Sequence, residues 1–407
     1  MTHGQCTTSS IRLKDGRCVG FDDLLAMGQM GIVELASASL LDDTPYDLLA
    51  DLMALPQTIG DDTQDVLLGA YNMAKNAHLL RSPPPTHLTD APAVVVGSGP
   101  SLEEWLPVLK RTYGSYVIVA SASAVRPLVD AGITPHFVAP KERTRYPSWC
   151  FDGCPDTAIY AGLHVVPDVA DRFPQRLCVG DATPLSMWYG SYLHIAPGPT
   201  SGTHALSVAL LVTSGPVALV GMDNCGGHYT GYQGVEQANT DYVDCYDGKR
   251  RESKWLYRVA RANMARKHEN RVIQLSTTAA IVDGIPLGAL PSPKPFALPK
   301  ILPQPSERYD DFIALLKRLP KDYDEVWGMT QAASTLDDTD MGRLVSGNYL
   351  LFQSMFAPTI AQLSMERRLG MSDADVMQWY REATRNILDM AVDTIHQMAT
   401  CGGHYER

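Results

Sequence analysis

The sequence has no apolar run that approaches the roughly 20 residues needed to cross a bilayer. Its first residues, Met1 to Arg17, are polar and lack the apolar centre of a secretory signal. Charged residues make up only 19% of the chain and hydrophobic residues 45%, which is ordinary for a globular protein. We therefore expect a soluble cytoplasmic protein that makes no contact with a membrane.

Cysteine and positive charge are also scarce. The eight cysteines are irregularly spaced over 407 residues, which fits a reducing compartment better than a disulfide framework. Cys150 and Cys154 are a close pair with no matching second pair, so we predict no metal site of the zinc type. A net charge of −11 argues against an extensive surface for nucleic acid, although it permits a local basic groove.

The chain is long enough for two or three domains. Residues 1–87 carry short helical patterns and end in a proline-rich segment. Residues 88–290 alternate strand and helix patterns, and residues 291–305 form a proline-rich linker to a helical C-terminal domain at 306–407. The pattern predicts an α/β protein with a Rossmann-like, mostly parallel sheet and helices on both faces, flanked by helical N-terminal and C-terminal regions.

The strands expected in the central region are apolar and rich in β-branched residues. They are Ala93–Val96, Tyr116–Ala120, His136–Ala139, Thr157–Gly162, Arg176–Val179, Tyr192–Ile195, Val217–Gly221 and Arg271–Leu275. Helix patterns lie at Ala122–Ala131, His204–Thr213 and Lys254–Lys267. Right-handed crossovers would align the carboxyl ends of these strands along one edge, where ligands bind at the point of strand-order reversal.

The first strand runs into a glycine turn made of Gly97, Ser98, Gly99, Pro100 and Ser101. Pro100 suits the first turn of a helix, and a strand, a glycine turn and a helix start can form a backbone cradle for an anion. The alternative is an ordinary turn that needs glycine only for its backbone angles. Neither the dinucleotide fingerprint nor a Walker A loop is present, because the third glycine and the Gly-Lys-Ser/Thr segment are missing.

Polar side chains follow several other expected strands. They are Ser121 and Ser123; Lys141, Glu142, Arg143 and Arg145; Thr200, Ser201, Gly202, Thr203 and His204; and Asp223 and Asn224. The hydroxyl groups could contact the ribose or base of a nucleotide, or only cap helices. The cations could offset phosphate charge, or form a solvated loop.

His228 is the candidate general base, because it lies in a Gly-Gly-His-Tyr loop after a strand and imidazole titrates near neutral pH. The alternative is an exposed histidine with no role. Asp223 could orient His228, bind a metal or cap a turn. His204 is the rival base, although its place at a helix start suggests packing or ligand contact.

Five short motifs occur in a fixed order along the central region. They are Ala93–Leu102, which ends in Gly-Ser-Gly-Pro-Ser-Leu, Val117–Pro135, Thr200–Ala205, Val220–Asp223 with His228 five residues on, and Thr277–Gly284. This series resembles the central domain of the motility accessory factor (Maf) proteins, which are flagellin nonulosonic-acid glycosyltransferases. Archaeal 6-hydroxymethylpterin diphosphokinases share that domain, and two of the segments are similar to those of bacterial sialyltransferases that use CMP-sugars. The flanking regions also match the Maf layout.

The sequence departs from this family pattern at two places. Many relatives have an Asp after the third strand, where this chain has Pro140, Lys141 and Glu142. Asn263 stands about where relatives often have Glu.

The resemblance implies a transferase that moves a sugar from a CMP-sugar or similar nucleotide-activated donor to a protein, glycan or other hydroxyl acceptor. His228 and Asp223 would be catalytic, and the polar residues named above would bind the donor. One alternative is a Mg²⁺-dependent pyrophosphokinase, which requires clustered carboxylates; beyond Asp223, Asp241 and Asp244 we find few at the strand ends. The other alternative is a non-catalytic nucleotide-binding or scaffold protein. The pyrophosphokinase alternative includes Mg²⁺, and no other cofactor is implied.

The C-terminal region contains three amphipathic helical patterns, at Tyr309–Leu319, Thr359–Leu369 and Asp373–Met398. Such helices can cap the sheet, form a homo-oligomer contact or recognise the acceptor.

Overall fold

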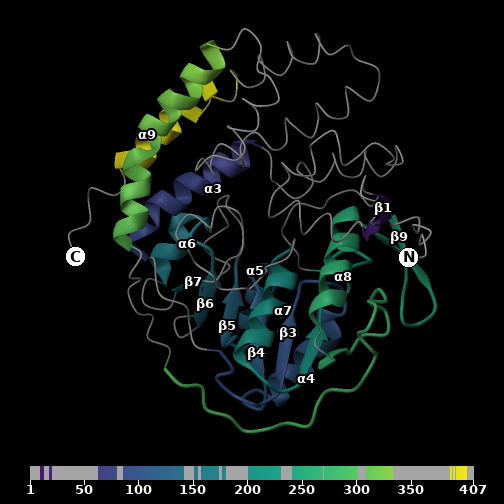
Figure 1. Cartoon of the computed structure of the whole chain (residues 1–407). Coiled ribbons are helices and arrows are strands. Elements are labelled where there is room, and N and C mark those ends of the chain that lie inside the picture. Colours follow the sequence, from purple (N-terminus) through teal and green to yellow (C-terminus); the bar gives the residue numbers. More distant parts are fainter. Residues whose placement is uncertain are drawn as a thin grey trace, which may run out of the picture. The chain divides into compact units, whose positions relative to one another are not determined.

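The computed structural model describes residues 10–12, 18–20, 63–79, 86–141, 151–154, 157–173, 177–179, 200–230, 241–268, 270–300, 309–332, 386, 388–389 and 391–400 (Figure 1). The chain divides into two compact units. One comprises residues 1–78, 183–190 and 308–407, and the other comprises residues 79–182 and 191–307. The expected strand Tyr192–Ile195 and the expected helix Thr359–Leu369 lie outside the described residues.

A seven-stranded sheet forms the centre of the second unit, and its described strand pairs are all parallel. In spatial order the strands are β11 (Val272–Gln274), β8 (Val217–Val220), β3 (Ala93–Val96), β4 (Val117–Ser121), β5 (Phe137–Ala139), β6 (Ala158–Ala161) and β7 (Leu177–Val179). Val95 of β3 pairs with Val119 on one side and with Leu219 on the other. The α/β, Rossmann-like fold class expected from the sequence is confirmed.

The order of the strands reverses at β3. From β3 the chain moves outward through β4, β5, β6 and β7, and then returns to place β8 on the other side of β3. In sheets of this kind the crevice outside the carboxyl ends of the two strands at the reversal is the usual ligand site. The carboxyl ends of β3 and β8 are therefore the place where a functional site is expected.

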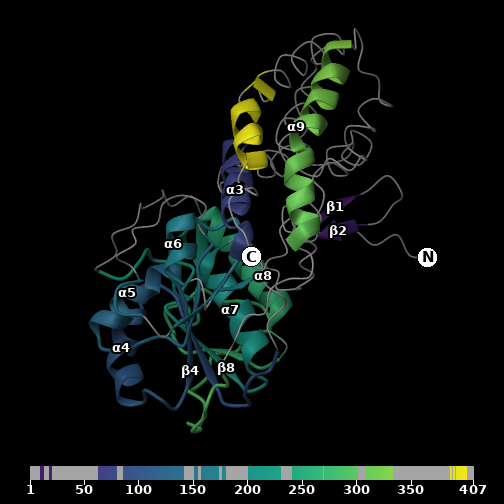
Figure 2. The ribbon, with the colours of Figure 1, turned by 90° about the vertical axis from the view of Figure 1, so that its left-hand side faces the viewer.

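Helices cover both faces of the sheet (Figure 2). One face carries α4 (Leu102–Arg111) and α5 (Ala122–Asp130), and the other carries α7 (Ser201–Val212) and α8 (Trp255–Lys267). The short α6 (Pro167–Arg172), which the sequence patterns did not predict, follows β6. The reversal of strand order explains the two faces, because right-handed crossovers in opposite directions along a sheet place their helices on opposite sides.

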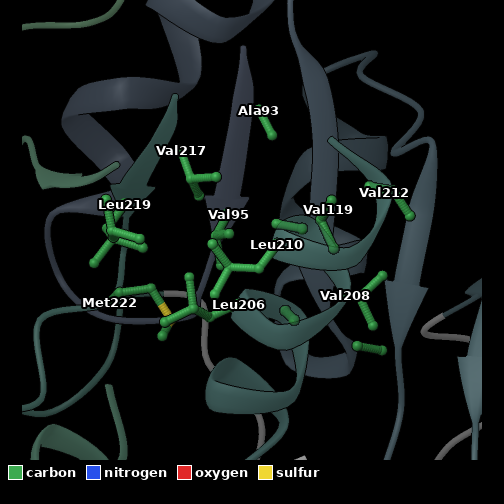
Figure 3. Packing of buried hydrophobic residues seen from close by; sticks show 14 of the residues in the cluster. Ala93, Val95, Val119, Leu206, Val208, Leu210, Val212, Val217, Leu219 and Met222 are labelled. Atoms are coloured by element: carbon green, nitrogen blue, oxygen red, sulfur yellow. The ribbon is translucent and has the colours of Figure 1, made fainter. Parts of the chain in front are cut away.

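The main core lies between the sheet and α7 (Figure 3). Val95, Val119 and Leu219 point from three neighbouring strands toward Leu206 and the rest of α7, and all four side chains are fully buried. Period-two alternation sends the intervening residues of each strand to the opposite face. Strands covered on both sides must be apolar throughout, which is why the sequence shows continuous runs of Val, Ile and Ala.

A separate antiparallel hairpin, β9 (Asp241–Asp244) and β10 (Arg250–Ser253), lies in the sequence between β8 and α8. Asp241 and Asp244 belong to this hairpin and not to the carboxyl edge of the parallel sheet, so the expectation that they lie at strand ends of the main sheet was wrong. The sequence did not reveal the hairpin because β10 is made largely of charged residues, which are unusual in strands.

The first unit contains the strands β1 (Ser10–Arg12) and β2 (Cys18–Gly20), which pair antiparallel, and the helices α3 (Thr63–Lys75) and α9 (Tyr309–Ala332). A 3-10 turn, η1 (Ala77–Leu79), follows α3. The expected helix Tyr309–Leu319 is confirmed and continues through Pro320. Helical residues 391–400 overlap the end of the third C-terminal pattern, Asp373–Met398. The Tyr323 hydroxyl donates to the Leu388 carbonyl at 3.3 Å. Among the helices described here, none is long and apolar enough to span a membrane.

Candidate functional site

The glycine turn after β3 is bonded to the end of β8. The Gly97 N–H donates to the Val220 carbonyl at 2.8 Å, and the Gly99 N–H donates to the Gly221 carbonyl at 2.7 Å. The Ser101 N–H donates to Oδ2 of Asp223, also at 2.8 Å. An anion at this turn could not use these three donors, so the expected backbone cradle stays a prediction that depends on other N–H groups of the turn. Protein groups accept the hydrogen bonds instead.

Asp223 holds the start of α4. Besides the backbone bond, its Oδ1 accepts the Ser101 hydroxyl at 2.6 Å, and the carboxylate is only 2% exposed. Burial raises the pKa of Asp223, and the two hydrogen bonds from Ser101 act in the opposite direction. A buried carboxylate thus occupies the helix start where the sequence suggested a ligand anion, since helix N-termini favour negative charge. This geometry gives Asp223 a structural contact, whereas its catalytic role stays a prediction.

Two glycines permit the close approach of these segments. A Cβ on Gly99 would lie 2.4 Å from Asp223 Oδ2 and 2.7 Å from the Gly221 carbonyl oxygen. Gly221 has φ of +63°, and a Cβ there would lie 2.3 Å from the Gly97 carbonyl oxygen. Only glycine avoids both the backbone strain and the clash. The turn thus needs glycine for close packing between the strand ends, which an ordinary turn that needs glycine only for its backbone angles does not explain.

His228 lies over this turn and has hydrogen-bond partners on both ring nitrogens. Nδ1 is 3.1 Å from the Ser98 hydroxyl, and Nε2 is 3.2 Å from the Tyr257 hydroxyl. The Tyr229 N–H donates to the Ser98 carbonyl at 3.0 Å, which ties the histidine loop to the turn after β3. The imidazole is therefore held in place at the carboxyl ends of β3 and β8.

Hydroxyl groups extend this network to β4. Ser123 donates to the Ser98 hydroxyl at 2.9 Å, and Ser121 lies 3.4 Å from Ser123. A neutral imidazole has one donor nitrogen and one acceptor nitrogen, so the direction of this chain and the tautomer of His228 are linked. If Ser98 donates to Nδ1, then Nε2 carries the proton. If Nδ1 donates to Ser98, then Nε2 is the acceptor and can take a proton. The structure thus brings together Ser98, Ser121, Ser123 and His228, which the sequence named separately.

Tyr257 and Lys254 belong to the same cluster, and the sequence patterns did not identify them. Both lie at the start of α8, and the Nζ of Lys254 lies 5.4 Å from the centroid of the Tyr257 ring. Lys254 is 4% exposed, which is unusual for lysine. A tyrosine in an amphipathic helix is ordinarily a packing residue, so Tyr257 alone gives no indication of a site. The sequence could have indicated this part of the site only by the lysine and the tyrosine at the start of the helix that follows the histidine loop.

The segment before α7 caps its own helix. The Thr200 hydroxyl accepts the Thr203 N–H at 3.1 Å, and the Thr203 hydroxyl accepts the Thr200 N–H at 3.0 Å. This reciprocal pair is a capping box, and it starts α7 at Ser201, before the predicted start at His204. His204 is 1% exposed within the helix, as the packing alternative for this residue predicted. A Cβ on Gly202 would lie 2.8 Å from Sδ of Met222, the residue that also packs against Gly97.

The structure also describes two further candidates, Asn224 and Lys141. Asn224 has φ of +54°, and its side-chain amide donates to the Met222 carbonyl at 3.1 Å, so it shapes the loop after β8. Lys141 is half-buried after β5, whereas Glu142, Arg143 and Arg145 lie outside the described residues, as does Cys150. Burial, with smaller contributions from the charges of Lys141 and Arg266, lowers the pKa of Lys267 to about 7. Its ammonium group donates to Ser207 at 2.9 Å.

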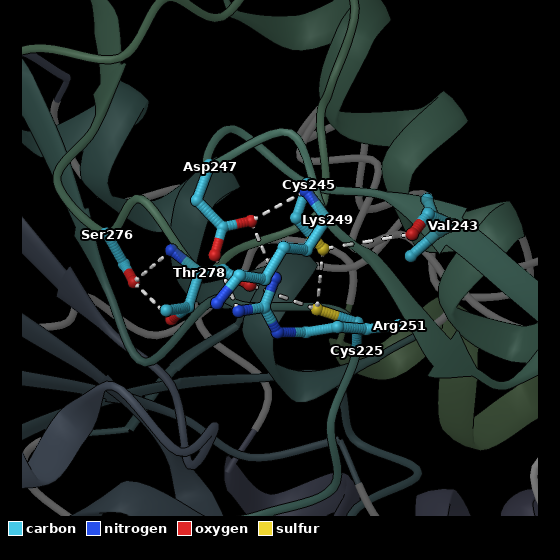
Figure 4. A network of polar contacts seen from close by, with 8 residues as sticks. All are labelled: Cys225, Val243, Cys245, Asp247, Lys249, Arg251, Ser276 and Thr278. Carbon is cyan, nitrogen blue, oxygen red and sulfur yellow. Dashed lines mark hydrogen bonds and ion pairs between the residues drawn. The ribbon is translucent and has the colours of Figure 1, made fainter.

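A second polar network joins the hairpin to the loop after β8 (Figure 4). Cys225 and Cys245 are buried free thiols with sulfur atoms 3.7 Å apart, and burial raises the pKa of Cys225 to about 12. Arg251 makes a two-point ion pair with Asp247, at 2.8 and 2.7 Å. Within the part of the chain that the structure describes, no group of three or more His, Cys, Asp or Glu side chains is arranged to hold a metal ion.

The fold and the site define an α/β protein of the Rossmann-like class with a polar cluster where the strand order reverses. Residues 70–227 match the family described as 6-hydroxymethylpterin diphosphokinase MptE-like. The structure is similar to that of a MAf glycosyltransferase from Magnetospirillum magneticum AMB-1, with a TM-score of 0.61 and 16% identity over 85% of this chain. The match spans 62% of that larger chain. A comparison with curated proteins found no match.

The match to the MptE-like family model over residues 70–227, and the fold shared with a MAf glycosyltransferase, agree with the resemblance expected from the sequence motifs. At 16% identity, the structural similarity establishes a shared fold.

Proposed function

We propose that this protein is a transferase that moves a sugar from a nucleotide-activated donor to a hydroxyl group of an acceptor, with His228 as the general base. The observation that carries the proposal is the position of His228, held between Ser98 and Tyr257 at the carboxyl ends of β3 and β8. This is where parallel α/β sheets bind their ligands. The MptE-like domain and the fold shared with a MAf glycosyltransferase support a transferase.

In this reaction the acceptor oxygen forms a bond to the sugar carbon while the bond from that carbon to the donor phosphate oxygen breaks. The electron pair of the broken bond stays on the phosphate, and the acceptor proton moves to the base. His228 can receive that proton at Nε2 when Nδ1 donates to Ser98. The acceptor hydroxyl then takes the place of the Tyr257 hydroxyl, which lies 3.2 Å from Nε2. A general base of this kind contributes roughly 10²- to 10⁴-fold to the rate.

For the donor, we propose a CMP-activated sugar of the nonulosonic type. The order of sequence motifs shared with Maf proteins and sialyltransferases supports this choice. The hydroxyl groups of Ser98, Ser121 and Ser123, which line up from β3 to β4, would contact the ribose or base. Thr200, Ser201 and Gly202 lie across Met222 from the glycine turn and are further candidates.

A second candidate is pyrophosphate transfer from ATP to a hydroxymethyl group, which the description of the matching family favours. Such a reaction uses Mg²⁺ to neutralise the phosphates. Asp223 lies against the glycine turn, but Ser101 donates to both of its oxygens, so it could bind a metal only by giving up these bonds.

The two candidates are separated by thermal shift with CMP, UDP, GDP and ATP, each with and without Mg²⁺. A ligand at about 100 times its Kd stabilises the fold by about 2.7 kcal/mol. Stabilisation by CMP without Mg²⁺ supports glycosyl transfer, whereas a Mg²⁺-dependent response to ATP alone supports the pyrophosphokinase. Stabilisation by no nucleotide contradicts both.

His228→Ala then tests the base. We expect nucleotide affinity close to wild type and turnover reduced by at least about 100-fold. His204→Ala is the matched comparison, because His204 is buried in α7 and its loss should lower stability. Wild-type turnover in His228→Ala, with loss of turnover in a folded His204→Ala, would assign the base to the other histidine.

A further inference from the structure

Three backbone N–H groups of the glycine turn, which were expected to bind a donor phosphate, already have acceptors within the protein. The N–H groups of Gly97, Gly99 and Ser101 donate to protein acceptors, and one of these is the carboxylate of Asp223. Glu103 adds a second carboxylate close by, since it accepts the Thr230 N–H at 2.6 Å in the histidine loop. A phosphate bound beside His228 therefore needs positive charge from another element.

Lys254 brings a buried positive charge to the cluster. Its side chain is 4% exposed, and its Nζ lies 5.4 Å from the centre of the Tyr257 ring. Ammonium groups are strongly hydrated, so lysine is rarely buried without a specific interaction. The aromatic face attracts the ammonium group and helps to fix its position.

Tyr257 connects that charge to the candidate base. Its hydroxyl lies 3.2 Å from Nε2 of His228, and the two rings meet edge to face with centroids 6.5 Å apart. One tyrosine thus contacts the ammonium group with its ring face and the imidazole with its hydroxyl. This arrangement places a cation and a phenolic donor on the α8 side of His228.

We infer that Lys254 and Tyr257 form a phosphate subsite, in which Lys254 supplies the positive charge and Tyr257 donates a hydrogen bond to a nucleotide or sugar phosphate. The inference rests on the proposed function for its role in transfer. When the bond between sugar and phosphate breaks, negative charge grows on the phosphate oxygen, and a fixed cation beside it stabilises that charge. The Tyr257 hydroxyl, which leaves His228 when the acceptor enters, is then available to the phosphate.

The test compares ligands that differ only by phosphate. Lys254→Met keeps the aliphatic stem and removes the charge, Lys254→Arg restores a cation, and Lys249→Met is the matched control at an exposed lysine of the hairpin. Calorimetry with cytidine and CMP, and with inorganic phosphate and methyl phosphate alone, measures the contribution of phosphate in each variant. Circular dichroism verifies that each variant is folded.

We expect Lys254→Met to weaken CMP and methyl phosphate roughly 10- to 100-fold, the usual effect of losing a charge-assisted hydrogen bond. Cytidine should bind as it does to the wild type, Lys254→Arg should recover part of the loss, and Lys249→Met should change nothing. If phosphate compounds bind equally well to the wild type and to Lys254→Met, or bind neither, the inference is overturned. Loss of phosphate binding in Lys254→Met without any sugar transfer by the wild type would sustain the subsite and contradict the proposed function.

Discussion

Replacing Ser101 with alanine should destabilise the sheet unit strongly, because one hydroxyl serves two buried partners. The Ser101 hydroxyl donates to Asp223 Oδ1 at 2.6 Å and accepts the Gly221 N–H at 3.2 Å. A hydrogen bond to a charged group contributes about 1.5–3 kcal/mol, and a buried donor left without a partner costs about 1–3 kcal/mol. We therefore expect Ser101→Ala to lower the free energy of unfolding by roughly 3–5 kcal/mol.

The effect should also depend on pH. Burial already raises the pKa of Asp223, and the two bonds from Ser101 oppose that rise. The alanine variant keeps the backbone N–H bond but loses the hydroxyl bond, so the pKa rises further. The native carboxyl group then binds a proton more readily than the unfolded one, and stability falls as pH rises above the ordinary value of 3.8. The cost of Ser101→Ala should therefore be larger at pH 7 than at pH 4.

Urea denaturation measures the free energy of unfolding, and hydrogen exchange of peptides that cover β3 and α4 reports on this unit separately. Ser214→Ala is the control, because Ser214 is exposed and should change stability by less than about 0.5 kcal/mol. A cost below about 1 kcal/mol for Ser101→Ala, or the same cost at both pH values, would refute the reasoning that a buried carboxylate holds the start of α4.

Three further predictions concern other parts of the same unit. Gly99→Ala should cost at least about 2 kcal/mol in urea denaturation, because its Cβ would meet Asp223 and the backbone; a neutral result would contradict this packing. Lys267→Met should stabilise the fold near neutral pH, since a pKa lowered to about 7 makes wild-type stability increase as pH rises from 7 toward 10.5. The increase in the free energy of unfolding between pH 7 and 10.5 should be smaller in Lys267→Met than in the wild type. An equal dependence on pH in both proteins would contradict the prediction. Cys225, whose pKa is raised to about 12, should react with iodoacetamide at pH 8 only after unfolding, and rapid labelling of the native protein would contradict its burial.

The sequence was sufficient to predict the parallel sheet and the turn that follows its first strand. Continuous apolar runs such as Ala93–Val96 identify strands that are buried on both faces, and the glycine turn after them marks the junction with α4. Thr200 and Thr203 are residues of the kind that cap helices, and in the structure they form a capping box at the start of α7. These features depend on short stretches of chain, where local sequence determines local structure.

The partners within the site could not be predicted in the same way. Ser101 and Asp223 are 122 positions apart, and no local pattern indicates that the carboxylate takes the N–H that an anion would use. In the sequence, Tyr257 cannot be distinguished from a tyrosine that only packs in a helix. Only the fold shows that its hydroxyl lies beside His228. The hairpin that contains Asp241 and Asp244 was not predicted, because its strand β10 is charged and such strands are uncommon. The two aspartates were therefore expected at strand ends of the main sheet.

The bonds between the β3 turn and the β8 loop have a consequence for how such proteins diversify. Gly99, Ser101 and Asp223 fix one another, and Tyr229 joins the histidine loop to the same assembly. A substitution in this assembly disturbs stability and the position of His228 together, so selection for a new substrate has little freedom there. Side chains on α8 approach His228 from outside the assembly, and they can change without breaking those bonds. A change of ligand specificity would therefore begin on α8, while the glycine turn stays constant.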